Sequence, residues 1–196
     1  MVRPTLKLWR QTAISILTMT MVLAPNVAPA LDWSVQPEKS RVLFDYLRNG
    51  QPAEGRFTIF TGGGMFDRNA PGDATLELRI ESRSIDLDDS MASAFATSAE
   101  WFDSDNHPQV IYRLLKLTPE GGDRYHAIGE LTIRGRTRPI ETTITLDIGA
   151  DEAHASGSLI LDRKDYWLGI GPTALFVDIG REVAVRFDLT AHPAVY

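Results

Sequence analysis

The chain has 196 residues, the length of one domain or at most two. It contains no cysteine, which excludes a disulfide framework, a thiolate zinc site and a cysteine nucleophile. A net charge of -6 argues against a nucleic acid partner, and an apolar fraction of 43% is enough for one buried core.

Residues 1–30 have the layout of a secretory signal peptide. Arg3, Lys7 and Arg10 precede an uncharged, largely apolar stretch at 12–24, and small residues precede a predicted cleavage after Ala30. An uncleaved anchor is the alternative, but the apolar stretch is short for a bilayer. We expect one periplasmic domain over 31–196. Its 17 basic and 26 acidic residues disfavour adsorption on anionic lipid, so stable membrane insertion is not expected.

The mature chain alternates apolar and polar residues with period two, the pattern of half-buried strands. Breakers such as Asn49-Gly50 and Arg134-Gly135 separate the runs, and short connections imply antiparallel pairing. Eight or nine strands must then hide their edges in a barrel or in two paired sheets. The runs lie at 33–35, 41–47, 55–61, 76–81, 110–115, 125–134, 140–148, 159–161 and 183–189.

Two segments depart from this pattern. Residues 88–102 have period 3.6, with an apolar face that includes Met91 and Phe95, and Pro108 follows, so we predict one helix of about three turns packed on the sheet. The triple glycine at 62–64 is interpreted as a turn or bulge.

The 163–180 loop is long and rich in large apolar residues. Loops of this kind are more often lids or binding edges than idle connections. Its apolar residues are Tyr166, Trp167, Leu168, Leu175 and Phe176.

Polar motifs offer little chemistry. Asp86, Asp88 and Asp89 could be paired carboxylates for acid–base work, but a helix start, where the dipole favours anions, explains them better. Residues 103–107 resemble a calcium loop without its turn glycine and distal glutamate, so a helix-ending turn is favoured over a metal site. An enzyme that uses Asp86 or His107 on an apolar substrate is the rival hypothesis.

Three arginines, Arg134, Arg136 and Arg138, cluster at one predicted hairpin. They could bind a phosphate or carboxylate head group. A soluble hairpin tip whose charges discourage edge pairing is the favoured interpretation.

The order of short motifs resembles the YceI family of polyisoprenoid-binding-like bacterial proteins. The matching motifs are Gly55-Arg56-Phe57, Phe66-Asp67, Ser84-Ile85, Trp101-Phe102-Asp103, His107-Pro108, Gly129-Glu130-Leu131-Thr132-Ile133-Arg134-Gly135, Arg163-Lys164-Asp165-Tyr166 and Val183-Ala184-Val185. This resemblance implies an all-β, lipocalin-like, antiparallel up-and-down barrel of about eight strands. It also implies an apolar interior for a polyprenyl phosphate, a quinone or a fatty-acid derivative. It supplies no catalytic residue and no cofactor.

We therefore expect non-catalytic binding or carriage of a long-chain isoprenoid or other lipid, by a protein that could be a homodimer. A secreted domain with a filled core is a further alternative. Because membranes are already apolar, moving a lipid into a barrel gains little from dehydration, which favours carriage over tight storage. Strand parity and the helix face predict that the following residues line the cavity: Phe44, Tyr46, Phe57, Leu78, Phe95 and Tyr112.

Overall fold

A computed structural model describes residues 31–172 and 177–194. The predicted signal segment, and Leu175 and Phe176 of the predicted binding loop, lie outside the described residues. The described chain is mostly strands, with one α-helix, α1 (Ser90–Ala96). The strands are β1 (Leu31–Val35), β2 (Arg41–Arg48), β3 (Gln51–Phe57), β4 (Phe60–Phe66), β5 (Glu77–Glu81), β6 (Ile85–Asp86), β7 (Gln109–Gly121), β8 (Arg124–Ile133), β9 (Arg136–Ile148), β10 (Ala153–Asp162) and β11 (Glu182–Pro193).

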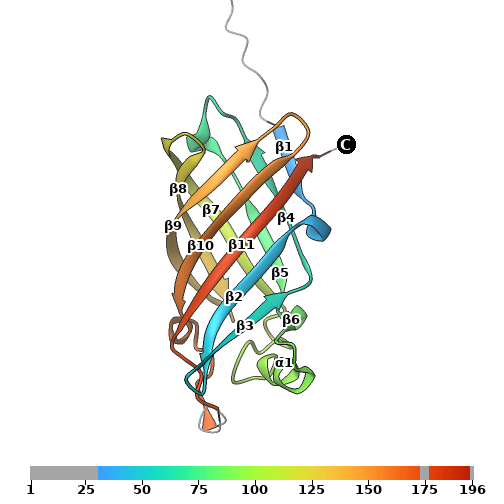
Figure 1. The fold of residues 1–196 in the computed structure, drawn as a ribbon, viewed down its shortest axis with the longest axis vertical. Coiled ribbons are helices and arrows are strands. Elements are labelled where there is room, and N and C mark those ends of the chain that lie inside the picture. The colour runs from blue at the N-terminus through green and yellow to red at the C-terminus, as the bar shows by residue number, and fades with distance from the viewer. Residues whose placement is uncertain (1–30, 173–176, 195–196) are drawn as a thin grey trace, which may run out of the picture.

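Eight of these strands close into an antiparallel barrel (Figure 1). The ring runs β1-β4-β5-β7-β8-β9-β10-β11 and returns to β1, because β1 pairs with both β4 and β11. Strands β7 to β11 form an uninterrupted meander, since each pairs with the next along the chain. The predicted antiparallel barrel with a single α-helix is confirmed in the described residues.

The remaining strands make the two ends of the barrel different. β11 pairs with β1 near its carboxyl end and with β2 near its amino end, and β3 and β6 follow beyond β2. In the described residues β6 pairs only with β3, so the sheet is not closed there, and Figure 1 shows α1 beside β3 and β6 at that end. We call this the α1 end and the opposite one the β1 end.

The β1 end is filled by side chains. Alternation in β8 points Tyr125 and Ala127 inward, where they pack with Leu117 of β7. Phe66 of β4 meets Tyr125 edge to face, with ring centroids 6.1 Å apart. The cluster also contains Ala74, Leu114, Ile144 and Leu146. Apolar side chains from β4, β7, β8 and β9 therefore pack together inside this end of the barrel.

The triple glycine lies within β4 and not in a turn, which corrects the expectation from sequence. A Cβ on Gly64 would sit 1.9 Å from the carbonyl oxygen of Thr75, and one on Gly63 would sit 2.7 Å from that of Trp33. Two backbones thus approach this strand more closely than a side chain allows, which is a recognised use of glycine in a strand.

Helix α1 is shorter than predicted. Asp89 begins it by accepting hydrogen bonds from the backbone N–H groups of Met91 and Ala92, but the helix ends at Ala96. Thr97 follows, and its hydroxyl donates to the carbonyl of Ala94. Thr and Ser side chains compete in this way for helical backbone groups, and the chain continues as turns. Those turns bring Trp101 into the core at 9% exposure.

Candidate functional site: an apolar cavity at the α1 end

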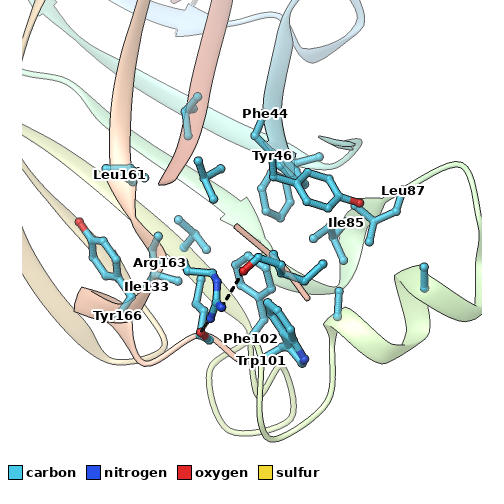
Figure 2. Close-up of a pocket in the computed structure, with 18 of the residues that line it drawn as sticks. Phe44, Tyr46, Ile85, Leu87, Trp101, Phe102, Ile133, Leu161, Arg163 and Tyr166 are labelled. Carbon is cyan, nitrogen blue, oxygen red and sulfur yellow. Dashed lines mark hydrogen bonds between the residues drawn. The ribbon is translucent and has the colours of Figure 1, made fainter. Parts of the chain in front are cut away.

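A cavity of about 440 Å³ opens at the α1 end (Figure 2). Its volume lies in the ~300–1,000 Å³ range of small-molecule pockets. The wall comes from the inward faces of β2, β8 and β11, from α1, and from the turns that follow α1 and β10, and β3, β5, β6, β7 and β10 each add one residue. Arg48, Asp89 and Met91 form its outer edge, which we call the rim. Met91 is 81% exposed, so the cavity reaches the surface there.

Four of the six residues predicted as lining lie on the cavity wall: Phe44, Tyr46, Phe57 and Phe95. Phe44 is the centre of an aromatic group, with ring centroids 5.9 Å from Tyr46 and 5.5 Å from Phe57. Phe95 lies on the helical side, 6.2 Å from Trp101. Their contact with a ligand stays a prediction.

The other two, Leu78 and Tyr112, face the interior but lie outside the cavity lining. They are cross-strand partners on β5 and β7. Each occupies space left by a glycine, because a Cβ on Gly62 would meet Leu78 at 2.9 Å and one on Gly129 would meet Tyr112 at 2.5 Å. Both side chains are thus part of the packed barrel interior.

Several wall residues were not singled out from the sequence. Val183 and Val185 of β11, and Leu131 and Ile133 of β8, were recognised as strand faces, but parity does not say which part of a face borders a cavity. Tyr166 and Leu168 of the predicted binding loop also lie on the wall, whereas Trp167 is 53% exposed. The position of Arg48 could have been predicted from the period of two in β2, which puts it on the same face as Val42, Phe44 and Tyr46.

Arg163 is a buried cation on the cavity wall, only 9% exposed. Its Nε donates to the carbonyl of Gly180 at 2.9 Å, and Nη2 donates to that of Ile179 at 2.9 Å. Nη1 donates to the carbonyls of Leu168 at 2.5 Å and Gly169 at 3.3 Å. Burial lowers the pKa of Arg163 from its usual value, although Asp162 and Asp178 oppose that shift. The guanidinium therefore ties together the two arms of the 163–180 loop.

Two buried tyrosines add no charge to the barrel interior. Burial raises the pKa of Tyr166 and of Tyr112 to about 12. The neutral phenol is therefore the form present at physiological pH, because burial in an apolar setting disfavours the phenolate.

The acidic residues near α1 have structural partners. Arg56 Nη2 donates to Asp86 at 2.5 Å and to Asp88 at 2.9 Å, and Asp89 is the helix N-cap. Asp86 and His107, which the enzyme hypothesis used, do not line the cavity.

A hydrogen-bonded turn occupies residues 103–107. The Asn106 side chain and the His107 backbone N–H both donate to Asp103, at 2.9 and 2.8 Å. Among the described residues, no group of three or more His, Cys, Asp or Glu side chains is arranged to hold a metal ion. None of the helices in that part of the chain is long and apolar enough to cross a membrane.

The arginines of the β8–β9 turn lie outside the cavity. Arg134 donates to the carbonyls of Ala99 and Trp167, and Arg136 stacks on the Trp167 ring 3.2 Å from its centroid. All three arginines, Arg138 included, line an open recess on the surface together with Trp167. Two of the three side chains thus fasten the loops next to the cavity.

These features define a class of protein: closed antiparallel barrels with room for one small apolar ligand. A family model described as a YceI-like domain matches residues 33–191, and the chain belongs to this family. The resemblance seen in the sequence is confirmed.

Individual relatives agree with this assignment. A UPF0312 protein of Vibrio cholerae is 20% identical over 180 residues, which cover 87% of this chain and 95% of that protein. The crystal structure of Burkholderia cenocepacia BcnA is similar with a TM-score of 0.74 and 26% identity, over 80% of this chain and 98% of BcnA. A polyisoprenoid binding domain from Saccharophagus degradans, implicated in plant cell wall breakdown, has a TM-score of 0.70 and 17% identity, over 84% of this chain and 99% of that domain.

Proposed function

We propose that this protein binds the hydrocarbon chain of an isoprenoid or fatty-acyl lipid in the cavity at the α1 end and carries it through the periplasm without catalysis. The observation that carries the proposal is the cavity itself, whose described lining side chains are apolar except for Arg48, Asp89, Arg163, the hydroxyl groups of two tyrosines and the indole N–H of Trp101. The signal-like residues 1–30 support the periplasmic location. The polyisoprenoid binding described for the Saccharophagus degradans domain supports the ligand class.

The packing of the barrel decides how such a chain would lie. Side chains fill the β1 end, so a chain enters from the rim and its depth is limited by Leu78, Tyr112 and the residues beyond them. Each methylene removed from water gains about 0.8 kcal/mol, but a membrane offers nearly the same gain. Exchange with a membrane is then close to balanced, as a carrier requires.

Filling the cavity tests this function. Val185 lies on the cavity wall, whereas its neighbour Ala184 does not and pairs with the exposed Ile160. Val185→Trp should weaken binding of the fluorescent fatty acid cis-parinaric acid at least ~10-fold, because the indole takes the place of the chain. Ala184→Trp adds the same group outside and should bind normally, and circular dichroism checks that both variants fold. Unchanged binding by a folded Val185→Trp variant would contradict the proposal.

A further inference from the structure

Three charged residues line the apolar cavity in the described part of the chain: Arg48, Asp89 and Arg163. A charge on an apolar wall is unfavourable unless it is paired, so each needs an explanation. Arg163 has one, because its guanidinium donates to four backbone carbonyls. Those bonds occupy Nε and both terminal nitrogens, which leaves Arg163 poorly placed to bind the head group of a lipid.

Arg48 is in a different situation. It is the last residue of β2, and period two puts it on the cavity face. Its backbone position is fixed, since Leu47 accepts a hydrogen bond from Gly180 at 2.8 Å and Asn49 donates to Asp178 at 2.6 Å. The side chain itself is 41% exposed, and its ion pair is a long one, with Nη1 4.0 Å from Oδ2 of Asp89.

Asp89 is a weak competitor for this guanidinium. Its Oδ1 already accepts from the backbone N–H groups of Met91 and Ala92, at 2.9 and 3.1 Å. Half-exposed ion pairs at this distance contribute little to stability. An anionic oxygen that approaches Arg48 closely can form charge-assisted hydrogen bonds of ~2.7–2.9 Å and displace it.

We infer that Arg48 is the head-group contact of the cavity, and that the site selects amphiphiles with an anionic carboxylate or phosphate head over neutral ones with the same chain. This inference rests on the proposed function, because it requires the chain of the ligand to lie in the cavity. The rim then holds the head group at the surface, within reach of Arg48, while the apolar wall holds the chain.

Binding of three amphiphiles that share one chain length tests the inference: palmitate, hexadecyl phosphate and palmitamide. Each displaces a fluorescent probe below its aggregation concentration. Wild-type protein should bind the two anions at least ~5-fold more tightly than the amide. Arg48→Gln should weaken both anions ~10-fold and leave the amide within ~2-fold, because an amide side chain keeps the size but not the charge. The two anionic arms show whether carboxylate or phosphate is preferred.

Two further variants separate head-group contact from a structural role. Asp89→Asn retains a good helix N-cap but removes the competing charge, so it should bind both anions a few-fold more tightly. Arg41→Gln is the matched control, since Arg41 lies on the outer face of β2, paired with Asp188 at 3.2 Å, and should change nothing.

Each outcome has a clear meaning. An Arg48→Gln variant that keeps the preference for anions, or that weakens all three ligands equally, overturns the inference. If Arg48→Gln does not fold, an Asp89→Asn variant with unchanged anion binding overturns it instead. Wild-type protein that binds all three equally contradicts only the role of Arg48. Failure to bind any of the three contradicts the proposed function as well.

Discussion

Single residues decide the chemistry of the cavity wall. Arg163 shows how a cation is tolerated there. In the described residues its guanidinium donates to backbone carbonyls of residues 168–180, and the centroid of the Trp101 ring lies 5.4 Å from its guanidinium carbon. Arg48 keeps its donors available at the rim. The same residue type thus serves as a loop fastener in one place and as a proposed ligand contact in another.

Replacing Arg163 should destabilise the fold. Arg163→Met leaves the carbonyls of Leu168, Ile179 and Gly180 without their donors, and we expect a loss of about 3 kcal/mol in the free energy of unfolding. Arg163→Lys should recover little of the lost stability, because an ammonium group cannot reproduce the planar set of donors that a guanidinium offers. Urea unfolding followed by circular dichroism measures this. The exposed neighbour Lys164, changed to Ala, is the control. Equal stability of Arg163→Met and wild type would show that these bonds contribute little.

At the scale of elements, the sequence predicts which face of a strand points into the barrel better than it predicts how far along the barrel axis a residue lies. Alternation in β8 correctly puts Ala127, Leu131 and Ile133 inside the barrel. It does not show that Ala127 belongs to the packed β1 end while Leu131 and Ile133 border the cavity. Depth along a barrel depends on strand stagger and on what the opposite wall contributes, and neither is local information.

The same limit explains the two misplaced lining residues. Leu78 and Tyr112 have the right parity, but Gly62 and Gly129 on neighbouring strands let both side chains fill the interior. Helix α1 shows another limit. Its apolar period continues to Phe102, yet the chain leaves the helix after Ala96, because turns can bury Trp101 and a continued helix would have presented Ala99.

The glycines of β4 yield a prediction about strand packing. Gly64→Ala forces a Cβ to within 1.9 Å of the Thr75 carbonyl oxygen, so the backbones must separate. Overpacking usually costs about 1–3 kcal/mol, and we expect the upper part of that range because the obstructing atom is backbone. Chemical denaturation provides the comparison. Gly72→Ala is the matched control, since nothing lies within 4 Å of its Cβ position, and it should be neutral. A Gly64→Ala variant as stable as wild type would show that the strand adjusts freely.

At the scale of the whole molecule, one barrel combines two kinds of interior. At the β1 end, apolar side chains of the ring pack against one another. Beyond β2 and β3 the described sheet ends at β6, and α1 and the turns after it form part of the cavity wall at this end. Figure 1 shows β1 and α1 at opposite ends of the long axis. Such a division suits the proposed carrier function, because a packed end can maintain the fold while a ligand is exchanged at the other end.

Native mass spectrometry of the protein purified from the organism that makes it tests the central claim most directly. We predict a population heavier than the bare polypeptide by the mass of a single lipid, which organic solvent extracts. Incubation of the delipidated protein with palmitate or farnesyl phosphate should then give a population heavier by the mass of the added lipid. A protein that shows only the bare-chain mass, both as purified and after both incubations, would contradict the account.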